Sequence, residues 1–136
     1  MTEHDEQEAL FNWAQMNEDK YPYLDTMHAI PNGGKRHPVV AVKMKQEGVK
    51  PGVPDIHLPV PCGRYHGLYI EMKYGKNKPT DEQKAWICSL TALGHMVVVC
   101  YSWQEAANII ELYYRLRDRE GFWSSDTKEK KAEVKV

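Results

Sequence analysis

Apolar residues at the centre of the chain recur at every second position. The apolar positions are Ile56, Leu58 and Val60 in residues 53–60, and Leu68, Ile70 and Met72 in residues 67–74. A repeat of two places alternate side chains on opposite faces of a β-strand. The pattern therefore predicts two strands, and the turn-forming linker 61–65 joins them as an antiparallel hairpin.

Four other segments carry apolar residues three or four positions apart, which predicts helices. We expect the first at residues 3–18 and the second at 38–46, and Gly94 is expected to end the third. The third and fourth helices begin at the motifs Thr80-Asp-Glu-Gln83 and Ser102-Trp-Gln-Glu105, which both fit a capping box.

Two further apolar runs complete the set of elements. Residues 26–30 predict a short strand, and the continuous run 96–101 predicts a strand that is buried on both faces. The order is then α-β-α-β-β-α-β-α, and the helix before the last strand implies a parallel crossover after the hairpin. We therefore expect an α/β fold in which helices flank one mixed β-sheet.

Length and composition narrow the class of protein. The 136 residues fit one domain, which we assign to residues 1–120, followed by a charged and disordered tail at 121–136. No apolar run approaches 18 residues, which excludes a membrane span, and the acidic start is unlike a secretion signal, so a cytoplasmic location is expected. The three cysteines show no Cys-x-x-Cys spacing, which argues against a disulfide framework and a zinc ribbon.

The net charge is only −1, but the basic residues are gathered in two regions. The first region has Lys35, Arg36, Lys43, Lys45 and Lys50 against Glu47 alone, and the second has Lys73, Lys76 and Lys78. Such clusters form a phosphate-facing surface in some proteins and an ordinary solvated face in others. Charge alone leaves both interpretations open.

The polar face of the predicted hairpin carries a candidate catalytic set. Glu71 and Lys73 are two residues apart and point the same way, and Asp55 faces Glu71 if the hairpin pairs as expected. Two carboxylates suit Mg²⁺, which takes oxygen ligands and can activate water for phosphodiester hydrolysis. A lysine beside them stabilises developing charge. The competing interpretation is a cross-strand salt bridge with no catalytic role.

The chain resembles the virus-type replication-repair nuclease (VRR-NUC) family of the PD-(D/E)xK nuclease superfamily, especially its short stand-alone phage members. The resemblance extends from about Glu3 to Tyr114. It rests on four ordered blocks: Ile30-Pro-Asn-Gly-Gly34, Glu47-Gly-Val-Lys-Pro-Gly-Val-Pro-Asp55, Gly67-Leu-Tyr-Ile-Glu-Met-Lys73 and Gln83-Lys-Ala-Trp86. It implies a restriction-endonuclease-like core and a DNA endonuclease that depends on Mg²⁺, with Mn²⁺ as a substitute.

The resemblance also assigns roles to individual residues. Asp55, Glu71 and the backbone carbonyl of Met72 match metal ligands, and Lys73 matches the catalytic lysine. A glutamate on the first helix belongs to the family site, and Glu3 is preferred to Glu6 and Glu8 because Glu3-x-x-x-Gln7 fits the usual pattern. Gln83 matches a glutamine near the site, and its role in the capping box is compatible with that.

The partner implied by the resemblance is DNA, with branched or junction-containing DNA favoured because some stand-alone members resemble Holliday-junction resolvases. Asn32 and Gly33 match the loop before the basic helix, although an ordinary turn explains them equally well. The residues expected to contact DNA phosphates are Lys35, Arg36, Lys43, Lys45, Lys76 and Lys78. Stand-alone members resemble homodimers, which would present two active sites to two strands.

Two other functions compete with the nuclease. A non-catalytic DNA-binding module on the same fold is disfavoured because all three catalytic positions hold competent residues. A sugar- or nucleotide-binding α/β protein is disfavoured because no Gly-rich phosphate loop is present. His57 shares a strand face with Asp55 and is a candidate to line the cleft, whereas the histidine spacing fits no usual zinc motif.

Overall fold

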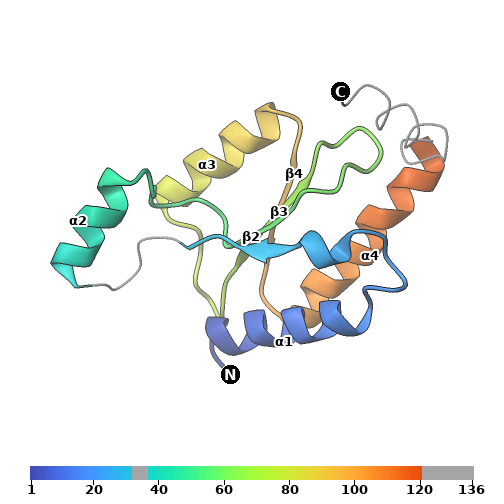
Figure 1. The fold of residues 1–136 in the computed structure, drawn as a ribbon, viewed down its shortest axis with the longest axis horizontal. Helices are drawn as coiled ribbons and strands as arrows, with labels where there is room; N and C mark the ends of the chain where they lie inside the picture. The colour runs from blue at the N-terminus through green and yellow to red at the C-terminus, as the bar shows by residue number, and fades with distance from the viewer. Residues whose placement is uncertain (32–36, 121–136) are drawn as a thin grey trace.

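The computed structural model describes residues 1–31 and 37–120, with side chains up to residue 117 (Figure 1). Its helices are α1 (Glu3–Met16), α2 (Pro38–Gln46), α3 (Asp81–Ala92) and α4 (Trp103–Glu120), with a 3-10 helix η1 (Leu24–Thr26). Its strands are β1 (His28–Ala29), β2 (Ile56–Leu58), β3 (Leu68–Met72) and β4 (Met96–Cys100). Apart from η1, this is the predicted order.

The four strands form one mixed sheet in the order β1-β2-β3-β4. The β2 strand pairs antiparallel with β1 and with β3, so the predicted hairpin is confirmed. The β3 and β4 strands pair in parallel, and α3 forms the crossover between them. The register places Ile56 opposite Ile70, which aligns the apolar positions of the two central strands on one face.

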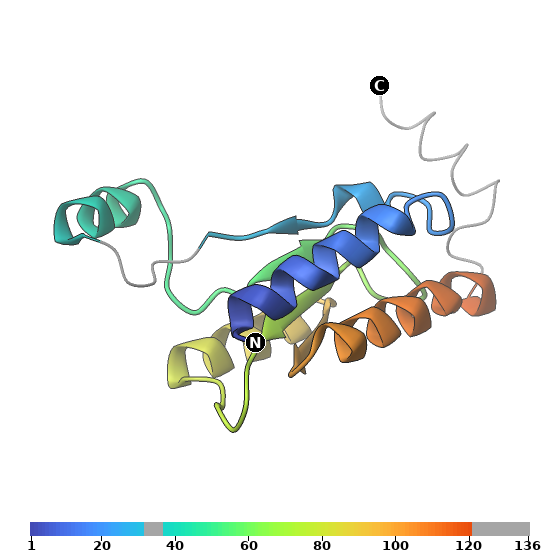
Figure 2. The same ribbon diagram turned by 90° about the horizontal axis from the view of Figure 1, so that it is seen from below.

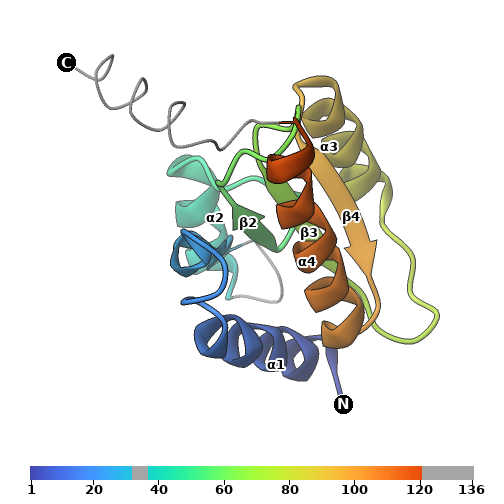
Figure 3. The same cartoon turned by 90° about the vertical axis from the view of Figure 1, so that its right-hand side faces the viewer.

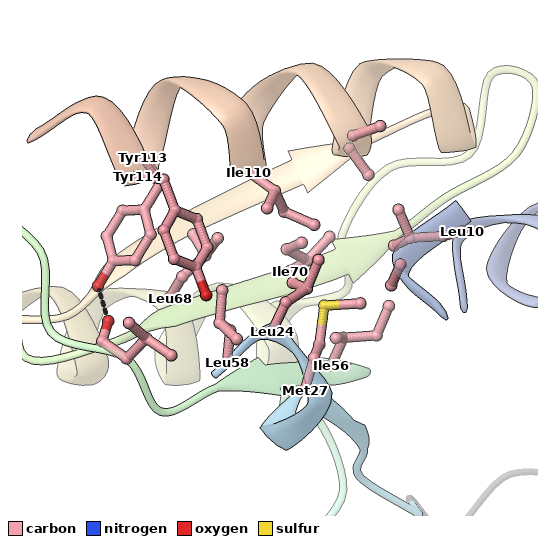
Figure 4. Packing of buried hydrophobic residues seen from close by; sticks show 14 of the residues in the cluster. Leu10, Leu24, Met27, Ile56, Leu58, Leu68, Ile70, Ile110, Tyr113 and Tyr114 are labelled. Atoms are coloured by element: carbon pink, nitrogen blue, oxygen red, sulfur yellow. Dashed lines mark hydrogen bonds between the residues drawn. The ribbon is translucent and has the colours of Figure 1, made fainter. Parts of the chain in front are cut away.

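The hydrophobic core lies between this apolar face and the helices α1 and α4, which contact each other (Figures 2 and 3). Figure 4 shows Ile110 and Tyr113 of α4 pointing toward Leu68 and Ile70 of β3. The Tyr113 hydroxyl donates a hydrogen bond to the Val60 carbonyl, which satisfies a polar group inside the core. The core therefore anchors β2 and β3 from one side and leaves their other face for different side chains.

The structure corrects two strand predictions. The first strand is shorter than expected because Thr26 belongs to η1, which leaves only His28–Ala29 in β1. Residues 96–99 of β4 are half-buried and not buried on both faces, because β4 is the outermost strand of the sheet in residues 1–31 and 37–120. An edge strand lacks a neighbour on one side, so a continuous apolar run overestimates its burial.

Helix α2 stands apart from the other elements (Figures 1 and 2). It has no buried residue, and Val39 and Val42 are 57% and 55% exposed. The proposed tail at 121–136 and the loop at 32–36 lie outside the described residues. Among the helices that the structure does describe, none combines the length and apolar character needed to span a membrane.

Candidate active site

The candidate site lies on the sheet face opposite the core, where β2 begins and β3 ends. The pairing of Ile56 with Ile70 places Asp55, one residue before β2, opposite Glu71. The Met72 N–H donates a hydrogen bond of 2.8 Å to Oδ2 of Asp55. The Ile30 N–H donates to the Asp55 carbonyl at 2.7 Å. The backbone N–H groups of Ile30 and Met72 therefore hold Asp55 beside Glu71, as the alternation of polar residues predicted.

Glu71 is a buried carboxyl group whose surroundings disfavour its ionisation. Its residue is only 2% exposed. Burial raises the pKa of Glu71 to about 8, and the charge of Asp55 and a hydrogen bond between the two carboxyl groups act in the same direction. The nearby Lys73 lowers this pKa, but its attraction is outweighed. The metal-free site therefore favours a proton on Glu71 at neutral pH.

Lys73 completes the predicted trio on the same face. Its Nζ lies 3.8 Å from Oε2 of Glu71, and the lysine is itself buried, with 8% of its surface exposed. The Lys73 N–H donates to the Cys100 carbonyl at 2.8 Å, which extends the pairing of β3 and β4 by one residue. This backbone bond positions the lysine. Glu71 and Lys73 are thus a buried pair beside the half-buried Asp55, and not a solvent-exposed salt bridge.

Gln83 performs both of the roles considered for it. Its Oε1 accepts from the Thr80 N–H at 2.8 Å, which completes the predicted capping box at the start of α3. Its Nε2 donates to Oε2 of Glu71 at 3.0 Å. One amide side chain therefore begins α3 and orients the buried carboxyl group.

The three N-terminal glutamates have separate positions. The charge of Glu3 raises the pKa of Glu71, so Glu3 lies near enough to the site to act on it. Glu6 is buried and its Oε1 accepts from the Trp103 N–H at 2.9 Å, which satisfies the start of α4. Glu8 lies on the surface, 3.3 Å from His4. Glu6 and Glu8 therefore contact partners outside the site.

The polar atoms of the site suit a hard divalent cation. With Glu71 ionised, its Oε1 is buried and receives no hydrogen bond from any residue in the described ranges. The Met72 N–H points to Asp55, and the carbonyl of a strand residue points to the same side as its N–H. No three His, Cys, Asp or Glu side chains in residues 1–31 and 37–120 form a metal cage. A site with two carboxylates and water ligands fits Mg²⁺.

Comparison with known proteins decides the family. The profile of the VRR-NUC domain matches residues 1–104, and these include every residue of the site. The chain belongs to the VRR-NUC family. A solved structure named "VRR_NUC domain protein" has 33% sequence identity and a TM-score of 0.73, and the match covers 85% of this chain and 90% of that chain. No protein of curated function matches. The chain thus carries a nuclease domain, for which DNA is the substrate class.

Gly52 is a residue of the VRR-NUC domain whose role was not predicted. It has φ +90°, and a Cβ at this position would lie 2.8 Å from the carbonyl carbon of Glu82. The turn before Asp55 therefore packs directly against the first turn of α3, next to Gln83. The Pro-Gly-Val-Pro segment indicated a tight connection, but only the fold shows which helix it approaches.

The basic residues predicted to bind DNA are dispersed around the VRR-NUC domain. Lys43 and Lys45 are exposed on α2, and Lys76 and Lys78 are exposed in the connection from β3 to α3. The predictions for Asn32, Gly33, Lys35 and Arg36 lie outside the described residues. The structure therefore brings together the acidic residues, Lys73 and Gln83, whereas the phosphate contacts remain predictions.

Histidine and tyrosine rings occupy the sheet face beside the carboxyl groups of this VRR-NUC domain. The ring of His57 is stacked on that of Tyr69, with centroids 4.1 Å apart and an interplanar angle of 7°. Burial lowers the pKa of His57 to about 4, and the neighbouring His28 and His95 lower it further. Alternation along β2 correctly placed His57 near Asp55, but the cross-strand partners depended on the register.

Proposed function

We propose that this VRR-NUC domain is a metal-dependent DNA endonuclease that hydrolyses phosphodiester bonds. The observation that carries the proposal is the buried Glu71 carboxyl group, which faces Asp55 and has an oxygen that no described residue satisfies. Ionising this buried carboxyl group beside Asp55 is costly, and a divalent cation between Asp55 and Glu71 would remove this cost.

Asp55, Glu71 and the Met72 carbonyl are the proposed ligands of Mg²⁺, with Mn²⁺ as a substitute. The cation would polarise the scissile phosphate and promote the formation of hydroxide from water. Lys73 is held at the site by its backbone bond to Cys100, so its ammonium group stabilises the negative charge that develops on the phosphate. Gln83 orients Glu71, and Glu3 adds a carboxylate beside the pair.

The proposed substrate is branched or junction-containing DNA, and the proposed assembly is a homodimer acting in phage DNA replication or repair. The family resemblance supports this choice. The exposed valines of the protruding helix α2 support a contact between two copies, because large apolar side chains exposed on a helix without a fully buried residue favour association. Two copies would present two active sites to two strands of a junction. Lys43, Lys45, Lys76 and Lys78 are proposed to contact phosphates.

Cleavage of labelled DNA tests the proposal. Linear, flapped and four-way branched substrates are incubated with the protein in Mg²⁺, Mn²⁺ or EDTA. We expect cleavage with either metal, none in EDTA, and a preference for branched substrates. Metal-independent cleavage, or full activity in the Lys73→Ala chain, would contradict the site assignment. Tight binding without any cleavage would favour the alternative of a non-catalytic DNA-binding module.

The dimer is tested separately by sedimentation velocity over a range of protein concentrations. We expect a dimer that dissociates in a Val39→Lys, Val42→Lys chain. A matched control carries Leu112→Lys on α4, because Leu112 has a similar exposure of 53% but lies on another helix. A monomer at every concentration would contradict the homodimer.

A further inference from the structure

Aromatic rings from neighbouring strands form a continuous row across the sheet. We define the ring row as His28 of β1, His57 of β2, Tyr69 of β3 and His95, which precedes β4. The ring centroids are 5.3 Å apart for His28 and His57, 4.1 Å for His57 and Tyr69, and 5.2 Å for Tyr69 and His95. Each ring therefore contacts the next, and the four rings form one continuous surface.

The ring row lies directly beside the proposed catalytic pair. His57 of β2 follows Asp55 by two residues, and Tyr69 precedes Glu71 by two residues on β3. A step of two residues along a strand is about 7 Å and returns to the same face of the sheet. The row is therefore next to the carboxyl groups, within reach of the nucleotide that adjoins the scissile phosphate.

The row also remains accessible from this side of the sheet. Helices α1 and α4 pack on the opposite, apolar face, and α3 packs mainly against β4. His28 is exposed, and the other three members of the ring row are half-buried. A Cβ on residue 67 would lie 3.3 Å from Nε2 of His57 and 3.5 Å from Nδ1 of His95. The glycine at position 67, just before β3, therefore allows the His57 ring to approach the backbone closely.

We propose that the ring row binds the nucleobase next to the scissile phosphate, and that this base must be unpaired to reach it. The inference rests on the proposed nuclease function and specifies its substrate as DNA with an unpaired nucleotide beside the cut. Aromatic and imidazole rings bind bases by stacking with little regard to sequence. A base inside a duplex already stacks on its neighbours, so a flap or a single strand supplies the unpaired base.

A binding experiment with paired changes in protein and DNA tests this inference. The Lys73→Ala chain binds a flapped oligonucleotide in Mg²⁺, and the nucleotides at the branch point are replaced one at a time by abasic sites. We expect one abasic site to weaken binding by about 5-fold or more. Adding His57→Leu and Tyr69→Leu, which keep apolar bulk, should weaken binding of the intact DNA and abolish the effect of the abasic site.

Tyr23→Asn provides a matched control, because Tyr23 is an exposed ring outside the row and Asn tolerates its positive φ. This chain should keep the full effect of the abasic site. An abasic effect that persists in the row variant, or no abasic effect at any position, would overturn the inference. Loss of dimerisation in the row variant, measured by sedimentation, would overturn it by assigning the row to a contact between two copies.

The outcome is separable from that of the proposed function. An abasic effect that depends on the ring row, in a protein that never cleaves DNA, would support the row and contradict the nuclease. Metal-dependent cleavage by a protein without any abasic effect would support the nuclease function and contradict base binding by the ring row. A melting temperature within a few degrees of that of the Lys73→Ala chain is required of each row variant, and the milder Gly67→Ala change replaces any variant that unfolds.

Discussion

The two faces of the hairpin β2–β3 come from the same two short segments but have opposite effects on the stability of the fold. On one face, Ile56, Leu58, Leu68 and Ile70 are all 0% exposed and pack against helices. On the other face, the buried Glu71 and Lys73 and the half-buried Asp55 bring two acids and an amine close together. The first face stabilises the fold by burying apolar area. The second face costs stability, because Glu71 resists ionisation where it lies.

This contrast indicates how a small domain holds a demanding site. The core face fixes the backbones of β2 and β3, and the backbone bonds of Met72 and Lys73 then position the acids and the lysine. Changes on the two faces should therefore have separable effects, which the following substitutions examine.

The largest expected effect on stability comes from the core face. Ile70→Ala leaves a cavity at a residue with no exposed surface and should lower the free energy of unfolding by about 2–5 kcal/mol. Urea denaturation measures this loss. Val97→Ala, a half-buried position of β4, should cost clearly less. An equal loss in both chains, or an Ile70→Ala chain as stable as the wild type, would contradict the core assignment.

The largest expected effect on activity comes from the site face. Asp55→Asn preserves the shape of the side chain but removes the charge of a proposed ligand, so cleavage should fall by about 100- to 1,000-fold. Single-turnover assays at saturating protein measure the rate. Asp19→Asn, at an exposed position beyond α1, should cleave at the wild-type rate. Near-normal cleavage by the Asp55→Asn chain would remove Asp55 from the site.

The cost of Glu71 should be visible as a pH dependence of stability. In the metal-free protein its pKa is about 8, above the 4.5 of an ordinary glutamate. The folded state therefore keeps a proton that the unfolded chain loses, and this stabilisation is complete below pH 4.5 and lost as the pH rises through 8. The Glu71→Gln chain should retain this stabilisation at high pH, because the glutamine side chain does not ionise.

Thermal unfolding in EDTA between pH 5 and 9 measures this difference. The Glu71→Gln chain should become progressively more stable than the wild type, on the order of a few kcal/mol by pH 9. Subtracting the two curves removes the histidine contributions, which have the opposite sign because the pKa of His57 is lowered. A difference that does not change with pH would show that Glu71 is ionised throughout.

The smallest expected effect separates the two roles of Gln83. Gln83→Leu removes the hydrogen bond to Glu71 and the cap of α3, so it should lower cleavage by about 10-fold and stability by about 1 kcal/mol. Thr80→Ala weakens the same capping box but leaves the bond to Glu71 in place. It should lose similar stability with little loss of cleavage. Equal cleavage by both chains would reduce Gln83 to a helix cap.

Local patterns predicted much of this architecture because they reflect local physics. Alternation placed Asp55 and Glu71 on one face, and the motif at Thr80 located the start of α3 within one residue. Contacts between distant segments were not predictable in this way. The approach of Gly52 to Glu82 depends on how helices pack on the sheet, and the burial of β4 depends on its place at the edge.

The ring row illustrates the same limit within the site. His57 was predicted to share the face of Asp55, but its stacking on Tyr69 requires the register, and His95 joins them only through the crossover to β4. Glu6 is a further example, because its bond to Trp103 joins residues 97 positions apart. Spacing predicts which residues share a face, whereas partners across the fold require coordinates.

The most direct test of the central claim is calorimetric titration of the protein with Mn²⁺ at pH 7 in two buffers of different ionisation enthalpy. If Asp55 and Glu71 hold the metal, binding must remove the proton that Glu71 retains, because metal ligands bind in the deprotonated form. The account predicts release of close to one proton per metal, and weak or undetectable binding to the Glu71→Gln chain. Tight binding without proton release, or binding unchanged by Glu71→Gln, would contradict it.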